Sequence, residues 1–277
     1  MNFDSREGAM DRPSWAPDDV DLGRPSVARV YDYFLGGSHN FAADRSFAEA
    51  ALKHMPEMPR IMQGNRAFLR RSVKYLVDQG IRQFVDLGSG IPTEGNTHAV
   101  AQADDPTVAV VYVDIDPVAV AHSRAMLRGN PYTAVLQADL RRPMDVLAAP
   151  AFGNLLNLDE PVAFLMNAVL HFVPDTERPA DIVSGYVAAA VPGSYVALSH
   201  AGAPPGASPG MADLVALYQR GPAPLIMRSA EEVRALLGDL SIVEPGVVPL
   251  GLWRPEPTSA EVDPAHLLGS CAVGRKD

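Results

Sequence analysis

FVDLGSGIPTEGNTH, residues 84–98, is the stretch that decides the predicted fold of this chain. Its first four residues are mostly apolar and predict a short buried strand. Gly88 and Gly90 follow, and a turn built on residues without side chains lets the backbone approach a ligand. Pro92 suits a loop or the first turn of a helix, where its missing N–H costs little. A strand, a glycine turn and a helix in this order are typical of the entrance to a nucleotide-type site, because the free N–H groups attract a polar or anionic ligand.

The glycine turn lacks one feature of dinucleotide-binding proteins. Their G-x-G-x-x-G pattern has a third glycine, and Thr93 stands at that position here. This difference argues against a nicotinamide-dependent oxidoreductase, which is the less favoured enzyme class for this chain. Two nearby glycines after a strand also occur in plain tight turns, so the stretch by itself leaves a purely structural role open.

Carboxylates are predicted to follow the next two strands. Residues 108–113 predict a strand that is followed by Asp114, and residues 133–137 predict another that is followed by Asp139. A carboxylate can accept hydrogen bonds from both hydroxyls of a ribose, which is the expected role of Asp114. Asp139 fits either an acceptor for the amino group of a base or a turn-forming residue. Because carboxyl ends of parallel strands meet at one edge of a sheet, we expect these acids close to Gly88.

Later segments continue the alternation of strands and helices. Residues 161–166 and 194–199 predict the fourth and fifth strands, with Asn167, His171 and His200 near their ends. Further helices are expected at 117–128, 178–191, 211–220 and 229–237, and further strands near 240–244 and 268–273.

The segment before the first strand predicts a helical cap. Residues 1–24 show little periodicity and are interpreted as a mobile tail, whereas residues 44–55 and 59–79 carry apolar residues at helical spacing. Between these parts, aromatic and polar residues surround a double glycine: Tyr31, Tyr33, His39 and Asn40 flank Gly36 and Gly37. They fit a lid that closes over a substrate, and equally an ordinary helix hairpin packed on the core. The basic residues Arg66, Arg70, Arg71 and Lys74 are interpreted as a solvated helix face.

Composition narrows the classes of partner. The chain has 277 residues, of which 47% are hydrophobic, and a formal net charge of −10. This charge argues against nucleic acid and anionic membranes and favours a small molecule or a protein as partner. The single cysteine, Cys271, excludes an intrachain disulfide and a cysteine-rich metal site, so we expect no metal and a cytoplasmic location. No signal peptide or membrane span is expected, and the oligomeric state cannot be read from the sequence.

Several stretches together resemble a known family. FVDLGSG, YVDID, LQADL and AFLMNAVLHFV, in this order, resemble the motifs of class I methyltransferases that use S-adenosyl-L-methionine. YDYFLGGSHNFAADR, GNRAFLRRSV, GIPTEGNTH and VEPGVVPLGLWRP resemble one bacterial subfamily of these enzymes, long classed as having unknown function. The resemblance covers Pro25 to the C-terminus. It says nothing about the methyl acceptor.

The resemblance implies an α/β, Rossmann-like fold. The sheet would have seven mostly parallel strands with an antiparallel last strand and helices on both faces. Residues 25–80 would form the N-terminal helical cap, and residues 81–277 the domain that binds S-adenosylmethionine.

Carried over by position, the resemblance also implies roles for individual residues. The methionine part of the cofactor would contact Asp86, Gly88, Ser89 and Gly90; the ribose and adenine would contact Asp114, Ile115, Asp139 and Leu140; the sulfonium and the acceptor would lie beside Asn167, Ala168 and His171. Pro92 stands where methyltransferases often have glycine, which leaves the ligand's path past this corner open.

Methyl transfer from a sulfonium needs few catalytic side chains, because the cofactor supplies the electrophile and the protein binds, orients and dries the reactants. An oxygen or nitrogen acceptor can still need a base, for which His171 and His200 are the candidates; each also fits a structural role. Tyr31 is a third candidate catalytic residue, and Tyr33, His39 and Asn40 are candidates for substrate binding.

The leading hypothesis is a methyltransferase that acts on a small molecule. The alternative is a regulatory or scaffold protein that binds S-adenosylmethionine without turnover, which nothing in the sequence excludes. A cavity lined by aromatic residues and one histidine would favour a neutral aromatic acceptor, whereas a cavity lined by arginine would favour a carboxylate or phosphate.

Overall fold

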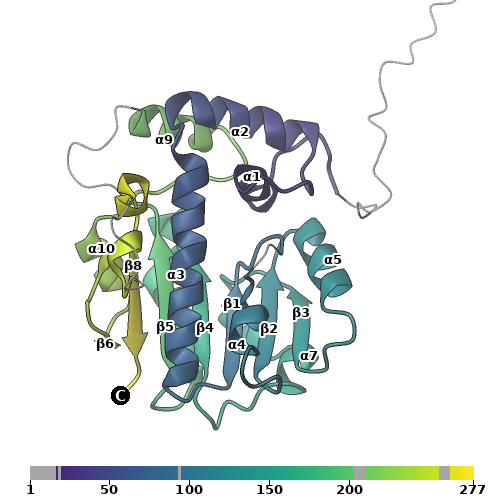
Figure 1. The fold of residues 1–277 in the computed structure, drawn as a ribbon, viewed down its shortest axis with the longest axis vertical. Coiled ribbons are helices and arrows are strands. Elements are labelled where there is room, and N and C mark those ends of the chain that lie inside the picture. The colour runs from purple at the N-terminus through teal and green to yellow at the C-terminus, as the bar shows by residue number, and fades with distance from the viewer. Residues whose placement is uncertain (1–16, 18–19, 93–94, 203–209, 256–262) are drawn as a thin grey trace, which may run out of the picture.

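A computed structural model of the chain describes residue 17 and residues 20–92, 95–202, 210–255 and 263–277, and its centre is a sheet with helices on both faces (Figure 1). The sheet has eight strands in the order β3-β2-β1-β4-β5-β8-β6, and β7 also pairs with β8. The strands are β1 Gln83–Leu87, β2 Ala109–Asp114, β3 Thr133–Gln137, β4 Ala163–Asn167, β5 Tyr195–His200, β6 Ser241–Ile242, β7 Val248–Pro249 and β8 Ser270–Arg275.

The predicted sheet is confirmed, with one addition. Strands β1 to β5 are parallel to one another, and β8, the last strand, runs antiparallel to β5. The extra strand is β7, which lies between the strands predicted near 240–244 and 268–273. Two residues are too short a run to produce a periodic pattern, so packing beside β8 decides this pairing.

The strand register brings the carboxyl ends of the central strands together. Leu87 of β1 pairs with Val113 of β2, and Asn167 of β4 pairs with Ser199 of β5. The strand order reverses between β1 and β4, because β2 and β3 lie on one side of β1 while β4 and β5 lie on the other. Such a switch point is where open α/β sheets bind their ligands.

The helices are α1 Val27–Phe34, α2 Ala42–His54, α3 Met58–Asp78, α4 Thr97–Ala101, α5 Pro117–Met126, α6 Pro143–Leu147, α7 Pro150–Gly153, α8 Pro179–Ala189, α9 Met211–Gln219 and α10 Ala230–Leu236, with 3-10 turns η1 Leu170–Phe172, η2 Asp175–Glu177, η3 Leu250–Leu252 and η4 Pro264–Leu267. The helices with predicted bounds lie close to those bounds, and two short helices, α6 and α7, were not predicted. The helix after the glycine turn begins only at Thr97, so Pro92 is not in its first turn. None of the helices in the described part of the chain combines the length and apolar character needed to cross a bilayer.

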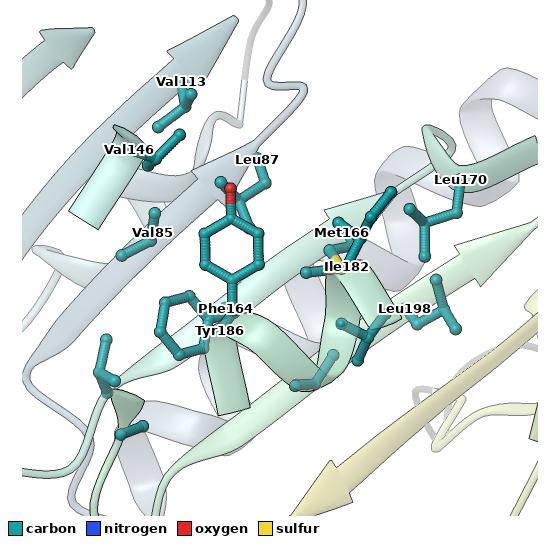
Figure 2. Packing of buried hydrophobic residues seen from close by; sticks show 14 of the residues in the cluster. Val85, Leu87, Val113, Val146, Phe164, Met166, Leu170, Ile182, Tyr186 and Leu198 are labelled. Atoms are coloured by element: carbon teal, nitrogen blue, oxygen red, sulfur yellow. The ribbon is translucent and has the colours of Figure 1, made fainter. Parts of the chain in front are cut away.

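The centre of the sheet is buried on both faces, which explains why β2 reads as almost continuously apolar. On one face, Val85 and Phe164 pack with Tyr186 of α8, as Figure 2 shows. On the opposite face, Phe84 belongs to a cluster that includes Phe68 of α3. Alternate residues of one strand therefore serve two separate cores.

A third apolar cluster forms the cap above the carboxyl ends of the strands (Figure 1). Phe34 of α1, Met55 after α2, and Leu214 and Tyr218 of α9 belong to it. The cap thus includes α9, which is distant in sequence from the predicted cap segment. The division into 25–80 and 81–277 stays a prediction. Most of the predicted tail lies outside the described residues, but Val20 is buried beside Phe41 and Ile91.

The basic run on α3 is only partly solvated. Arg70 and Lys74 are exposed, as predicted. Arg71 is half-buried, and its guanidinium donates to the carbonyls of Leu250 and Trp253 at 2.6 and 2.8 Å. The interpretation as a solvated face is therefore wrong for Arg71, because the segment after β7 folds back over this part of α3.

Candidate active site

Two cavities lie under the cap, next to each other at the carboxyl edge of the sheet. The first, named here the polar cavity, is lined by Ser26, Val27, Ala28, Tyr31, Asn65, Arg66, Leu69, Asp86, Gly88, Ser89, Gly90, Asp114, Ile115, Asp116, Ala138, Asp139, Leu140, Asn167, Ala168, Val169 and Phe172. Every residue assigned to cofactor binding from the sequence is in this lining, at the carboxyl ends of β1, β2 and β4 or on the turns after β1 to β4.

The glycine turn after β1 leaves no room for a side chain at its first position. Gly88 has a φ of +74°, and a Cβ on it would lie 2.4 Å from Cγ2 of Val169. Gly90 has a φ of +67°, with open space around its Cβ position. Gly88 is therefore required for packing and backbone conformation, and Gly90 for conformation alone.

Asp114 is held rigidly at the end of β2. Its carboxylate accepts hydrogen bonds from the N–H groups of Gly90 and Asp116 at 2.7 and 2.8 Å. Burial raises the pKa of Asp114 to about 6, because a charged group is disfavoured away from water. Further donors, such as the two hydroxyls of a ribose, would stabilise the ionised carboxylate in this place.

Asp86 and Arg66 form the part of the polar cavity below α3. Burial raises the pKa of Asp86, although its carboxylate accepts a hydrogen bond from Thr97 Oγ1 at 2.6 Å. Arg66 donates from Nη2 to Asn96 Oδ1 at 2.9 Å, and its buried Nε has no hydrogen-bond partner among the described residues. A carboxylate and a guanidinium together can bind both charged ends of an amino-acid group.

Asn167 carries the clearest sign of a role in ligand binding. Both its Oδ1 and its Nδ2 are buried, and neither has a hydrogen-bond partner in the described part of the structure. A buried amide without partners is costly and calls for an explanation. The next residue, Ala168, has a φ of +54°, and its N–H donates to Ser199 Oγ at 2.9 Å. A strained backbone in this position is typical of a functional site.

Asp139 lies at the end of β3 and already has a cationic partner. Arg141 donates from Nη2 to its carboxylate at 2.6 Å and from Nε at 2.9 Å. Burial alone would raise the pKa of Asp139, but the hydrogen bonds from Arg141 hold it below its usual value. The carboxylate therefore stays ionised and able to accept further hydrogen bonds.

The second cavity, named here the apolar cavity, lies between the cap and the ends of β4 and β5. It is lined by Val27, Tyr31, Phe34, Met55, Met58, Ile61, Met62, Asn65, Ala168, His171, Phe172, Ser199, His200, Ala201, Gly202, Met211, Leu214, Tyr218, Leu225, Met227, Leu250, Leu268 and Gly269. No Asp, Glu, Lys or Arg is among these described residues. The two cavities share a wall that consists of Val27, Tyr31, Asn65, Ala168 and Phe172.

A model of the S-adenosyl methyltransferase family matches residues 13–277. The chain belongs to this family. It is 39% identical to a candidate methyltransferase from Thermobifida fusca YX, with a TM-score of 0.89 over 95% of this chain and 99% of the other. It is 34% identical to a DUF574 family protein from Streptomyces avermitilis MA-4680, with a TM-score of 0.88 over 93% and 99% of the two chains. No curated protein matches it.

Family and fold together make this chain a methyltransferase whose cofactor is S-adenosyl-L-methionine. The residues present fit that cofactor. The partnerless amide of Asn167 and the partnerless Nε of Arg66 line the polar cavity, and a Cβ on Gly88 would clash with Val169 there. A dinucleotide was the competing expectation, and the family match excludes it as the resident cofactor.

Three polar side chains of the methyltransferase connect the two cavities. Asn65 Nδ2 donates to the hydroxyl of Tyr31 at 2.9 Å, and Ser199 Oγ donates to Asn65 Oδ1 at 2.5 Å. Burial raises the pKa of the Tyr31 phenol, so this hydroxyl stays protonated at neutral pH. The chain of hydrogen bonds fixes Tyr31 in the shared wall.

The candidate histidines both line the apolar cavity, but their ring nitrogens differ in environment. His171 accepts a hydrogen bond at Nδ1 from the N–H of Ala201 at 3.2 Å. His200 pairs through Nδ1 with the carbonyl of Ala201 at 2.8 Å and through Nε2 with Arg228 Nη1 at 2.7 Å. Both nitrogens of His200 are therefore engaged, whereas among the described residues only Nδ1 of His171 has a partner.

The residues proposed for substrate binding lie elsewhere. His39 N–H and Asn40 Nδ2 donate to Asp32 Oδ2 at 2.9 and 2.8 Å, which closes the double-glycine loop around a buried carboxylate. Tyr33 reaches Glu49 at 3.4 Å. None of the three is in the lining of either cavity. Their role in binding a substrate stays a prediction, and the loop has the packed-hairpin form that was the alternative.

Sequence reasoning missed Asn65, Arg66 and Arg228 as site residues. Arg66 was included in the solvated face of α3, which is wrong, because it lines the polar cavity. A signal was present: Arg66 precedes Leu69 and Val73 by three and seven positions, which places it on their buried helix face. Arg228 gave no such signal, because the partners of a loop residue depend on tertiary contacts.

Proposed function

We propose that this methyltransferase transfers the methyl group of S-adenosylmethionine to a small-molecule acceptor bound in the apolar cavity. The observation that carries the proposal is the shared wall of the two cavities. In-line methyl transfer requires the two reactants to lie next to each other. With the cofactor in the polar cavity, the adjoining apolar cavity would hold the acceptor. The left-handed backbone at Ala168 lies in that wall.

The proposed roles in cofactor binding follow the position of each residue in the polar cavity. Asp114 and Ile115 would bind the ribose and flank the adenine, Asp139 and Leu140 would meet the adenine edge, and Asp86, Gly88, Ser89 and Gly90 would contact the methionine part. Asn167 and Ala168 would lie beside the sulfonium. We add Arg66 as the partner of the methionine carboxylate, because its Nε lacks a partner among the described residues.

The proposed acceptor is neutral and mostly apolar. The described lining of the apolar cavity has no charged side chain of Asp, Glu, Lys or Arg. Burying a charged acceptor there would cost several kcal/mol without a partner of opposite charge. The aromatic side chains of Tyr31, Phe34, Phe172 and Tyr218 favour a ring compound.

We favour an enzyme over a regulatory or scaffold protein that binds S-adenosylmethionine without catalysing a reaction. A protein that only senses S-adenosylmethionine needs no second cavity beside the reactive sulfur. The apolar cavity, joined to the polar one through Tyr31 and Asn65, is the observation that favours an enzyme. A cytoplasmic location is proposed for the same protein, since its single cysteine is buried and free.

The proposal is tested in two steps with the full chain. Calorimetric titration should show binding of S-adenosylhomocysteine, the product form of the cofactor, and the variant Asp114→Ala should bind it at least tenfold more weakly. Neutral single-ring phenols, anilines and ketones are then incubated with S-adenosylmethionine, and methylated product is followed by mass spectrometry. Absence of cofactor binding, or turnover confined to charged acceptors, would contradict the proposal.

A further inference from the structure

His171 has a fixed proton arrangement that follows from one hydrogen bond. Its Nδ1 accepts from the backbone N–H of Ala201 at 3.2 Å. A backbone N–H can only donate, so Nδ1 must present a lone pair to it. In the neutral ring the single proton is therefore on Nε2.

The protonated nitrogen is available to the apolar cavity. Nε2 of His171 has no hydrogen-bond partner among the described residues. It is nevertheless not sealed from solvent, unlike the buried nitrogens of Arg66 and Trp253. His171 is 8% exposed and lines the apolar cavity, so this cavity is the space open to a ring nitrogen that has no protein partner. The ring therefore offers an N–H donor, and no lone pair, to a molecule in the cavity.

Neighbouring groups keep His171 neutral. Burial lowers the pKa of His171 well below its usual value, and His200 and Arg228 lower it further. The groups that face the ring are Phe172 on its own turn, His200 at the end of β5 and the buried guanidinium of Arg228. Asp175 pairs with Arg228 and its side chain is 81% exposed. Glu232 and Asp175 both raise the pKa of His200, but neither is among the causes that shift the pKa of His171. No carboxylate in the described surroundings therefore favours a charged His171.

Arg228 also fixes the second ring. It donates from Nη1 to Nε2 of His200 at 2.7 Å and to the carbonyl of Leu170 at 3.1 Å. The Nδ1 of His200 must then carry its proton, which it donates to the carbonyl of Ala201 at 2.8 Å. Ala201 is thus held by both rings. Its N–H cannot turn away from His171 without breaking the hydrogen bond between its carbonyl and His200.

We propose that His171 is a fixed hydrogen-bond donor, rather than a base, and that it selects a neutral, mostly apolar acceptor carrying a carbonyl-type oxygen beside the methylated atom. The inference rests on the proposed function, since it assumes that the acceptor occupies the apolar cavity. As the bond from sulfur to methyl breaks and the bond to the acceptor forms, a proton on the methylated atom leaves to water. His171 has no lone pair facing the cavity to receive it.

The dimensions of the cavity agree with a single-ring ketone. The apolar cavity offers about 90 Å³ to the centre of a water molecule. One water needs roughly 10–15 Å³ of such volume, so the space corresponds to roughly six to nine waters. Acetophenone, a ring with one carbonyl, is of this size.

The proton arrangement is tested directly by nitrogen-15 NMR of the full chain labelled at histidine. Two-bond correlations should identify Nδ1 of His171 as the bare nitrogen and Nε2 as the protonated one, unchanged between pH 5 and 8. A bare Nε2, or a His171 that becomes doubly protonated within this range, would overturn the proposal. The variant His171→Gln assigns the resonance by its loss.

Selection of an oxygen is tested with two probes of equal shape. Acetophenone and α-methylstyrene differ only in carrying C=O or C=CH₂, and their binding is measured by ligand-observed NMR with S-adenosylhomocysteine present. Acetophenone should bind roughly two- to tenfold more tightly, as expected for one hydrogen bond. His171→Gln, which keeps an N–H donor, should retain part of this preference, and His171→Phe should abolish it.

Equal binding of the two probes, or an unchanged preference in His171→Phe, would overturn the inference. Failure to bind S-adenosylhomocysteine would instead contradict the proposed function. The NMR measurement on the wild-type protein needs no ligand, so it decides the inference even where His171→Phe fails to fold.

Discussion

At the scale of single residues, Asp114 combines full burial with two backbone donors, and it is the residue through which pH should control cofactor binding. Because the pKa of Asp114 is about 6, a large fraction of its carboxyl groups is protonated at mildly acidic pH when no cofactor is bound. Hydroxyl donors of a ribose favour the ionised form, so binding must release the proton wherever pH lies below this pKa.

We therefore expect the affinity for S-adenosylhomocysteine to be constant above about pH 7 and to fall below pH 6, by up to about tenfold per pH unit. Asp86, whose pKa burial also raises, should act in the same direction. Calorimetric titrations between pH 5 and 8 check this. The control Asp114→Asn cannot ionise, so it should bind S-adenosylhomocysteine weakly and with little pH dependence. A wild-type affinity that does not change over this range would refute the assignment of Asp114 as the titrating group.

Gly88 offers a second test at the residue scale. Gly88→Ala should destabilise the protein by about 1–2 kcal/mol for the left-handed backbone alone, and by more because of the contact with Val169. It should also weaken binding of S-adenosylhomocysteine strongly. The matched control is Gly129→Ala, with a φ of +92° but open space and no place in either cavity lining. This control should lose stability in urea unfolding yet keep its affinity; equal losses of affinity in both variants would count against the site.

At the scale of elements, the turns η1 and η2 depend on one buried cation. The side chain of Arg228 is 5% exposed and donates to the carbonyls of Leu170 and Val173 as well as to Asp175. A buried carbonyl that loses its donor costs about 1–3 kcal/mol. The element that presents His171 to the apolar cavity is thus positioned by a residue that need not touch a ligand.

Arg228→Met should lower the free energy of unfolding by about 2–4 kcal/mol, because it leaves carbonyls without donors in the interior. The exposed Arg220→Met should change it by less than about 0.5 kcal/mol. Urea unfolding measures both values. In Arg228→Met we also expect the preference for acetophenone over α-methylstyrene to be lost, while the affinity for the cofactor changes little. A variant that keeps this preference but loses cofactor affinity would contradict the role of Arg228 in positioning His171.

At the scale of the whole molecule, the cap and the sheet meet across the two cavities. Helix α1 lies above the carboxyl ends of the strands in Figure 1, and Tyr31 on it belongs to the wall that the cavities share. A ligand in the polar cavity would contact residues of α1, α3 and the turns after the strands. It should therefore stabilise the cap against the sheet.

Hydrogen exchange measured with and without S-adenosylhomocysteine should show this coupling. At about 100 times its Kd, a ligand stabilises the folded state by about 2.7 kcal/mol. Slower exchange is expected for α1, the N-terminal half of α3 and the turns after β1 and β2, with little change in β6 at the far edge of the sheet. Protection confined to the turns, with none in α1, would show that the cap does not take part in binding.

Much of the fold and the polar cavity was predictable from the sequence alone. The apolar segments of β1, β2 and β3 mark parallel strands, and Gly88, Asp114 and Asp139 mark their ends. Parallel topology then brings these ends to one edge, whatever the other side chains do. The extra strand β7 was not predictable, because its two residues carry no periodic signal.

The sequence by itself determined the succession of strands and helices, the glycine turn and the strand-end residues of the polar cavity, because these depend on local pattern and on the geometry of parallel sheets. Only the tertiary structure decided which polar residues line the two cavities and which are held elsewhere. Asn40 closes a loop around Asp32, Arg66 enters the polar cavity, and Ala201 fixes the proton of His171. These outcomes depend on which distant segments meet, since a hydrogen-bond partner supplied by another part of the chain leaves no trace in the local sequence.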